Sequence, residues 1–208
     1  MIAHIRKSDR AVQSLESHCT QVAKICEQTA HPLGLSKAAY LIGLLHDMGK
    51  ATEKFKEYLF EVRFNSKISS PYHHSFAGAI FVYRRWFCDK SEDIYRHVAA
   101  QIFSLCISGH HAGLMNCLNE HMSSDFLENM KLGEKNRYDE SSEWFLKNII
   151  SAEKLDLLFE EAQQEIKRFI EERIRKQKTR KSFEFQLGML TRLLLSILVD
   201  ADRWDSAC

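Results

Sequence analysis

The chain of 208 residues has little of what several special classes of protein require. Its two prolines and eight scattered glycines favour helices with short connections over long loops. No uninterrupted apolar run reaches the roughly 18 residues that span a membrane, and the N-terminus lacks the apolar core of a signal peptide. These absences argue against a membrane protein and against a secreted one.

The cysteine pattern and the net charge exclude two further classes. None of the six cysteines forms a C-x-x-C pair, which argues against a zinc ribbon or a thioredoxin-like motif. Most cysteines lie in apolar stretches, as reduced thiols do, so we expect a cytoplasmic protein. With 29 basic and 28 acidic residues the net charge is +1, which excludes a uniformly basic nucleic-acid coat but allows a local basic patch.

Apolar periodicity predicts an all-α chain that forms a single domain over residues 1–208. No period-2 alternation is long enough to predict a sheet. Pro32 and Gly34 should end the first helix, Ser36 should cap the second, and Gly43 indicates close helix packing. The expected helices cover 11–30, 36–47, 53–62, 73–87 and 92–108, then one or two within 143–178, and a last one from about 183 to the end.

The pair His46–Asp47, in LLHDMGK, follows a strongly apolar helical segment. An ionisable pair at the end of a buried helix costs free energy unless something compensates it. A divalent metal ion is one compensator, since imidazole and carboxylate are both good ligands for transition metals. A hydrogen bond between the two side chains is the other interpretation.

Further histidines and aspartates recur near expected helix ends. His18 borders the apolar stripe of the first helix. The others lie in HHSFAGA (His73, His74), GHHAGL (His110, His111) and VDADRWD (Asp200, Asp202, Asp205). Each has an ordinary alternative: a boundary histidine, a solvated loop residue, or a surface or capping charge.

In this order the motifs resemble those of the HD phosphohydrolase superfamily and, more narrowly, of the HD nuclease domain of the CRISPR type I interference nuclease–helicase. The matching segments are SLESHCTQVA, GLLHDMGK, HHSFAGA, SGHHAGL and LLLSILVDADRWDS, and they extend over residues 14–206. The resemblance implies a compact helical HD-domain bundle with a metal site between its central helices.

The resemblance also implies two ligand sets that share Asp47. The first is His18, His46, Asp47 and Asp202, and the second is Asp47, His74, His110 and His111. Adjacent residues on a helix point about 100° apart, and residues two apart about 200°. Only one of His73 and His74, and one of Asp200 and Asp202, should therefore enter the site, and the family pattern selects His74 and Asp202. The nitrogen-rich donors favour one or two manganese, iron, cobalt or nickel ions, with magnesium as an alternative.

The implied activity is hydrolysis of single-stranded DNA by metal-activated water during CRISPR antiviral interference, with RNA as an alternative substrate. The implied partner is a helicase domain or subunit of that machinery. The chain would then be a stand-alone subunit or an excised domain, and its end at Cys208 favours missing C-terminal residues. Two competing functions stay open: a phosphohydrolase of nucleotides or small phosphoesters, and a non-catalytic docking domain stabilised by metal.

Asp47, as the bridging carboxylate, and Lys50 are the expected catalytic residues. Lys50 follows Asp47 by three residues and could hold the scissile phosphate, or it could be a solvated lysine past a helix end. The surrounding G-LLHDM-GKA is not a phosphate-binding P-loop, because its spacing is wrong by one and Ala51 replaces the required Ser or Thr. An NTPase is therefore rejected.

A basic segment near the C-terminus is a candidate nucleic-acid contact. Its basic residues are Arg173, Arg175, Lys176, Lys178, Arg180 and Lys181. They could neutralise backbone phosphates, with Phe183 and Phe185 stacking on bases. The alternative is a solvated connector between the last two helices.

Overall fold

A computed structural model describes residues 1–5, 11–62, 74–88, 90–115, 124–132, 137–174 and 179–207. The α-helices are α1 (Leu15–Ala30), α2 (Ser36–Leu45), α3 (Glu53–Val62), α4 (Ser75–Val82), α5 (Ile94–Gly109), α6 (Asp125–Lys131), α7 (Tyr138–Asn148), α8 (Ala152–Phe169) and α9 (Arg180–Ala207). Short 3-10 turns cover His31–Leu33 and Met48–Lys50, and π-helical turns extend α4 over Tyr83–Phe87 and α8 over Ile170–Ile174. The all-α prediction is confirmed, apart from one small sheet.

That sheet was not predicted. Strands β1 (Ile2–Ile5) and β2 (Val12–Ser14) pair in antiparallel register at the N-terminus. The expected first helix over 11–30 therefore begins four residues late. Ser14 has extended backbone angles and accepts a hydrogen bond from the Ser17 N–H, so it caps α1 and leaves the preceding residues free to form a strand. Val12, the first residue of β2, is 54% exposed.

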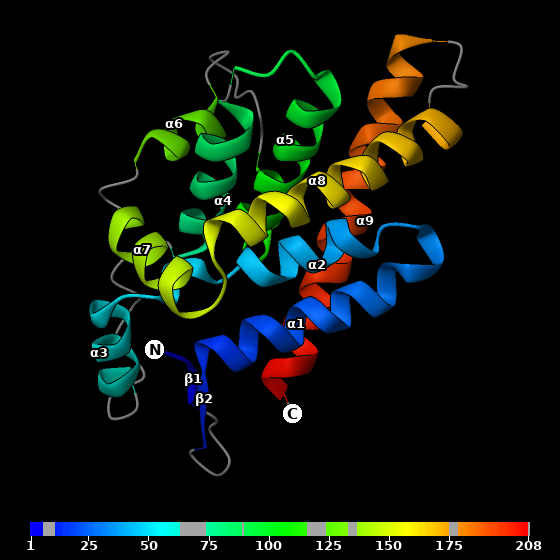
Figure 1. Cartoon of the computed structure of the whole chain (residues 1–208). Coiled ribbons are helices and arrows are strands. Elements are labelled where there is room, and N and C mark those ends of the chain that lie inside the picture. The colour runs from blue at the N-terminus through cyan, green and yellow to red at the C-terminus, as the bar shows by residue number, and fades with distance from the viewer. Residues whose placement is uncertain are drawn as a thin grey trace.

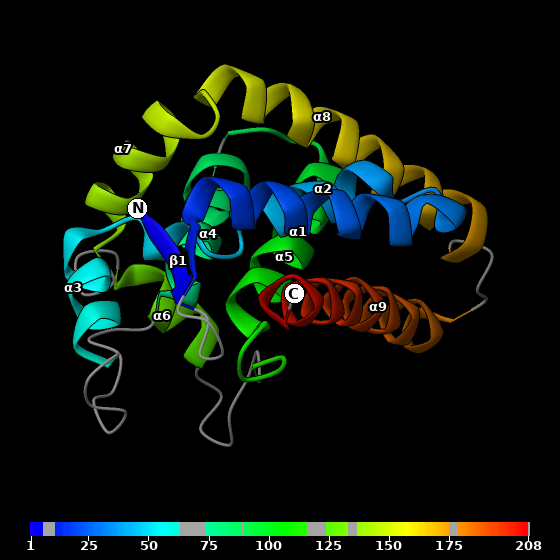
Figure 2. The ribbon, with the colours of Figure 1, turned by 90° about the horizontal axis from the view of Figure 1, so that it is seen from below.

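Helix α2 lies at the centre of the bundle. It packs against α1, α5, α8 and α9, and Figure 2 shows α1 and α2 between α8 on one side and α9 on the other. The predicted role of Gly43 is confirmed, because a Cβ at this position would lie 2.8 Å from Cα of Ala23. The absence of a side chain thus lets α1 and α2 approach closely.

Ser36 does not cap α2, contrary to the prediction. The cap position is Leu35, and the first backbone amides of the helix are bound by a distant side chain. Oε2 of Glu165, on α8, accepts hydrogen bonds from the N–H groups of Lys37 and Ala38 at 2.7 and 3.0 Å. A carboxylate at a helix N-terminus satisfies orphan donors and the helix dipole, so the tertiary contact replaces the local cap.

The other elements form mostly where the pattern predicts them. Helix α3 has the expected bounds, and 143–178 holds two helices, α7 and α8, the first of which begins earlier at Tyr138. Helix α9 begins at Arg180 rather than near Phe183, because the Thr179 hydroxyl accepts from the Ser182 N–H and caps it. Figure 1 shows α9 crossing behind α1 and α2, with its C-terminal end beside the β-ribbon.

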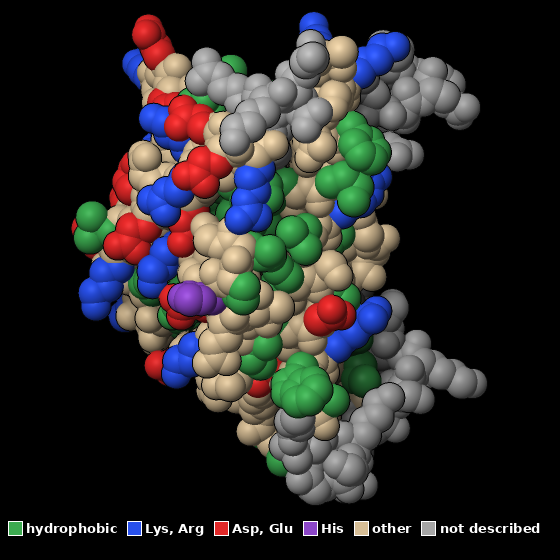
Figure 3. Space-filling view, turned by 90° about the vertical axis from the view of Figure 1, so that its right-hand side faces the viewer, with side chains coloured by type: hydrophobic (Ala, Val, Ile, Leu, Met, Phe, Trp, Pro, Cys, Tyr) green, Lys and Arg blue, Asp and Glu red, His purple; other side chains and the backbone are tan. Residues whose placement is uncertain are grey.

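By length and composition, α9 is the one helix in the described ranges that could cross a membrane, with a mean hydropathy of 1.4 over an 18-residue window. The core helix of a soluble protein passes the same test, and α9 packs against α1, α2 and α5. The face of the molecule in Figure 3 carries Lys, Arg, Asp and Glu side chains among hydrophobic ones, as water-exposed surfaces do. The helix is therefore weak evidence for a membrane protein.

Candidate metal centre

The structure brings all seven predicted ligands into one cluster. The end of α5 and the α2–α3 connection supply two ligands each, and α1, α4 and α9 supply one each. The cluster draws His18 from α1, His46 and Asp47 from the residues after α2, His74 from the start of α4, His110 and His111 from the end of α5, and Asp202 from α9. His73 lies outside the described residues.

Asp47 stands at the centre, fully buried, and its two oxygens face different neighbours. Oδ2 lies 3.1 Å from Nε2 of His18 and 3.3 Å from Nε2 of His46. Oδ1 lies 3.7 Å from Nε2 of His110 and 3.9 Å from Nε2 of His74. This division of the two oxygens is what a carboxylate bridging two cations requires.

Backbone carbonyls orient two of the rings. Nδ1 of His46 donates to the Gly43 carbonyl at 2.7 Å, and Nδ1 of His110 donates to the Ile107 carbonyl at 2.6 Å. Both bonds reach back three residues to the end of the preceding helix. Because a carbonyl can only accept, the proton of each neutral ring lies on Nδ1, and Nε2 presents a lone pair to the cluster.

A carboxylate orients His18 in the same way. Nδ1 of His18 donates to Oδ2 of Asp205 at 2.6 Å, and the same oxygen accepts from Nε2 of Gln13 at 2.7 Å. A carboxylate behind a metal-binding histidine fixes the ring and raises its basicity. Sequence reasoning noted Asp205 but did not assign it a role. Its position three residues after Asp202, on the same side of α9, was the available signal.

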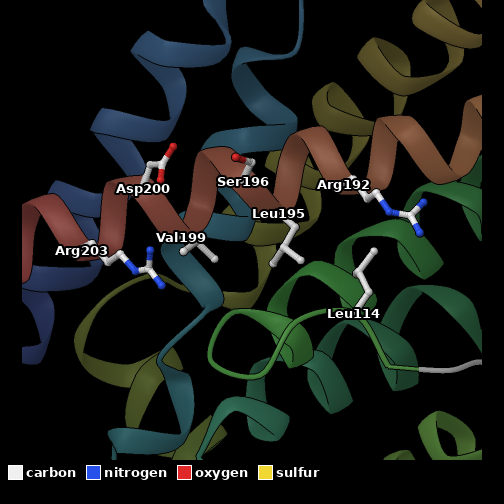
Figure 4. A pocket seen from close by; sticks show the side chains of 7 residues that line it. All are labelled: Leu114, Arg192, Leu195, Ser196, Val199, Asp200 and Arg203. Atoms are coloured by element: carbon white, nitrogen blue, oxygen red, sulfur yellow. The ribbon is translucent and has the colours of Figure 1, made fainter.

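The structure separates Asp202 from Asp200, as the helical geometry predicts. Oδ1 of Asp202 lies 3.3 Å from Nε2 of His18 and 3.7 Å from Nε2 of His46. Asp200 is exposed and lines a groove on another side of α9 (Figure 4).

His4 is a cluster member that sequence reasoning missed. It lies on β1, and its Nε2 is 3.4 Å from Nε2 of His18 and 3.3 Å from Nζ of Lys50. Its position depends on the pairing of β1 with β2, which leads directly into α1. A lone histidine near the terminus gave no signal, because the strand that carries it was not predicted.

His74 and His111 form the outer part of the cluster, where His111 is exposed. Their Nε2 atoms lie 2.8 Å apart. Gly49 permits this arrangement, because a Cβ there would lie 2.0 Å from the carbonyl oxygen of His74. Burial above all lowers the pKa of His74 to about 3 and that of His111 to about 4, so both rings are neutral near pH 7.

The inner groups are highly charged. Burial alone would lower the pKa of His18, but its bonds to Asp202 and Asp205 outweigh burial and raise the pKa to about 10. Burial likewise opposes charge on His46, and Asp47 raises its pKa nonetheless. The pKa of Asp47 is held well below its usual range against the effect of burial, chiefly by Lys50 and His46. Without a metal, the raised pKa of His18 keeps a proton on that ring near pH 7, which offsets part of the carboxylate charge.

The donor set fits divalent metal ions. Oδ1 of Asp47 and Nε2 of His110 are buried and form no hydrogen bond with any described residue. Nε2 of His18 and Nε2 of His46 lie 3.2 Å apart, both directed at the same carboxylates. A metal ion between these donor atoms would satisfy the unpartnered groups and balance the buried carboxylates. Imidazole with carboxylate suits first-row transition ions.

Lys50 is buried, so the solvated alternative is wrong. Its Nζ lies 2.7 Å from Oδ2 of Asp47 and 5.7 Å from the centre of the Phe55 ring. The ammonium group therefore borders the inner part of the cluster, where it can meet an anion bound there.

The described residues of the basic segment lie away from the cluster. Arg173 packs over the Phe169 ring after α8, and Arg180 pairs with Glu184 at 2.7 Å. From Arg180 to Asp202 the helix rises about 33 Å, at about 1.5 Å per residue. Arg175, Lys176 and Lys178 lie outside the described residues. The expected connector is shorter than predicted, since Arg180 and Lys181 belong to α9.

The part of the chain that holds most of the cluster resembles a known protein family. Residues 15–116 match the HD domain. The match contains six of the seven predicted ligands, and α9 adds Asp202 from outside it. HD domains bind divalent metals, so the match indicates a metal-dependent hydrolase-type enzyme. No curated protein matched the chain in a second comparison.

Proposed function

We propose that the chain is a metal-dependent nuclease that hydrolyses phosphodiester bonds of single-stranded DNA. The observation that supports it most is the division of Asp47 between two sets of histidine nitrogens. His18, His46 and Asp202 would hold one ion beside Oδ2, with His4 as an added donor. His74, His110 and His111 would hold the other beside Oδ1.

Bound divalent ions supply two things in such a site: neutralisation of the phosphate charge and a water of lowered pKa. The chain's own residues do the rest. Asp205, Gly43 and Ile107 fix the rings of their histidines, so little reorganisation is needed. Lys50 would hold a non-bridging phosphate oxygen, and the exposed His111 marks the open side where substrate enters.

The resemblance of the motifs extends the proposal to CRISPR antiviral interference in the cytoplasm, with a helicase domain or subunit as the partner. RNA is the second candidate substrate. A phosphohydrolase of nucleotides could use the same ligands, and relative rates on nucleotides and oligonucleotides separate the two activities.

The test is a cleavage assay on circular single-stranded DNA. Metal-stripped protein should be inactive, and Mn²⁺, Co²⁺ or Ni²⁺ should restore cutting. Asp47→Asn and Asp202→Asn should remove it, whereas Asp139→Asn, an exposed position on α7, should not.

Inactivity of the folded, metal-loaded chain on DNA and RNA would refute the nuclease. Hydrolysis of nucleotides alone would assign a phosphohydrolase. If metal removal only lowers the melting temperature and no phosphoester is ever cleaved, the domain serves docking.

A further inference from the structure

Helix α9 connects the metal centre with the basic residues of the C-terminal segment. Its inner face packs in the core through Leu190, Leu194 and Leu198. Its last turns carry Asp202 and Asp205, and its first turn carries Lys181. The outer face of the same helix is exposed between these points.

Three basic residues on that face recur at intervals of eleven. Lys181, Arg192 and Arg203 are all exposed. Eleven residues make about three turns of a helix, with a drift of only about 20° and a rise of about 16 Å. The three side chains therefore follow one line along α9, which we name the basic stripe.

The basic stripe carries uncompensated charge. Within the part of the chain that the structure describes, Lys181, Arg192 and Arg203 form no ion pair, whereas Arg180 pairs with Glu184 and Arg85 pairs with Asp156. Phe185, 66% exposed, lies one turn after Lys181 and offers an aromatic surface in the same region. Aligned cations beside an exposed aromatic ring suit a nucleic-acid strand.

A groove lies beside the second half of the stripe. Its lining is Leu114, Arg192, Leu195, Ser196, Val199, Asp200 and Arg203. Figure 4 shows Leu114, from the segment after α5, facing Leu195 and Val199, with the two arginines at opposite ends. Asp200, its one acid, lies on the edge of α9 away from Leu114. The groove thus has an apolar floor between two cationic ends.

The groove adjoins the metal centre. Arg203 directly follows Asp202, and Leu114 comes three residues after His111. A strand lying in the groove would therefore reach the exposed side of the cluster at its Arg203 end.

We propose that the basic stripe of α9 binds the phosphate backbone of single-stranded DNA and leads the strand through this groove to the metal centre. The inference rests on the proposed nuclease function and deepens it. The stripe rises about 33 Å from Lys181 to Arg203, which is far longer than a mononucleotide and fits several linked nucleotides. A flexible single strand can follow one side of the helix and then place a phosphodiester bond at the exposed side of the cluster.

The test combines binding with two kinds of cleavage. The variant K181A/R192A/R203A is compared with K131A/K147A/K154A, which removes the same charge from exposed positions on α6, α7 and α8. Affinity for a fluorescent single-stranded oligonucleotide is measured by anisotropy over a range of salt. Hydrolysis of bis(p-nitrophenyl) phosphate, a diester too small to span the groove, reports the metal centre alone.

The stripe variant should bind single-stranded DNA at least about tenfold more weakly. Its plot of log K against log salt should lose about 2 from the slope, since each phosphate contact on a single strand contributes about 0.7. KM for oligonucleotide cleavage should rise, and hydrolysis of the small diester should be unchanged. Restoring charge with K181R/R192K/R203K should recover most of the affinity.

Equal affinity and salt slope in the two triple variants would overturn the proposal, as would a wild-type chain that binds no single strand. Tighter, stripe-dependent binding of duplex DNA would also overturn it. If the wild type binds single strands through the stripe but cleaves none, the nuclease function fails while the binding surface stands.

Discussion

Individual hydrogen bonds decide which nitrogen atoms reach the cluster. His46 and His110 use the carbonyls three residues earlier, so their ring orientation follows from the helix ends that carry them. His18 needs Asp205, which lies 187 residues further along the chain. The local pairs could be anticipated from a histidine at a helix end, but the distant pair could not.

Asp205→Asn should lower metal affinity or activity about 10- to 100-fold, the usual cost of removing a carboxylate behind a ligand histidine. The amide keeps the shape but accepts more weakly and removes the charge next to His18. Isothermal titration with Mn²⁺ measures the change, and Asp139→Asn is the matched control. An unchanged affinity would mean that Asp205 does not support His18.

His4→Ala should weaken binding of one of the two ions by about tenfold and leave the other unchanged. The side chain faces His18 and Lys50 on the Oδ2 side of Asp47 only. The number of metal ions bound per chain at a limiting metal concentration, compared between the variant and the wild type, measures this effect. His31→Ala, an exposed histidine after α1, is the control and should have no effect. An equal loss of affinity for both ions would contradict the placement of His4 beside one of them.

Metal affinity should rise with pH, because ligands must lose their protons. The pKa of His18, raised to about 10 by Asp202 and Asp205 against burial, means that this ring is protonated at pH 7 without metal. Its stabilising contribution to the metal-free fold is complete below the unfolded pKa of about 6.5 and is lost as pH rises through about 10. Titration in buffers of different ionisation enthalpy should show proton release on metal binding; buffer-independent heats would contradict this.

At the scale of elements, the close contact of the Asp47 segment with the start of α4 depends on one glycine. Gly49→Ala places a Cβ within 2.0 Å of the His74 carbonyl oxygen, so the backbone must shift. We expect a loss of about 1–3 kcal/mol in the free energy of unfolding, measured in urea, together with weaker metal binding.

Gly188→Ala is the control, and we expect it to change the stability in the opposite direction. It lies within α9, and an added Cβ there meets only Nη1 of Arg192 at 3.4 Å. Alanine should stabilise the helix by about 0.4–1 kcal/mol. If both substitutions changed the free energy of unfolding in the same direction, the close approach at Gly49 would not explain the effect of Gly49→Ala.

The elements show where sequence reasoning works and where it fails. Local sequence patterns predicted the bounds of α3 and α5 within two residues. The β-ribbon could not be predicted, because Ser14 and the pairing of two short strands override the helical pattern over 11–14. Because β1 was not predicted, His4 was not recognised as a member of the cluster either. The prediction that Ser36 caps α2 was wrong for a similar reason, because Glu165 binds the first backbone amides of α2 from another helix.

At the scale of the whole molecule, the metal centre joins elements that are far apart in sequence. The cluster unites α1, α2, α4, α5, α9 and the ribbon, so ion binding should stabilise all of them together. With free metal at about 100 times Kd, the gain is about 2.7 kcal/mol. A chelator should then lower the melting temperature by about 5–10 °C. No change in melting temperature would contradict metal binding to the folded chain.

The motif order predicted which residues meet, because the resemblance supplied the spatial arrangement that spacing alone does not give. The structure adds the orienting groups Asp205 and Gln13, the extra donor His4 and the burial of Lys50. The bonds of Asp205 to His18 and Gln13 join the two ends of the chain, which no local pattern contains.

Anomalous scattering from crystals grown with Mn²⁺ tests most directly whether Asp47 bridges two cations. We expect two peaks about 3.5–4 Å apart, one beside each carboxylate oxygen of Asp47. A single peak on one oxygen, or ions bound away from Asp47, would contradict it.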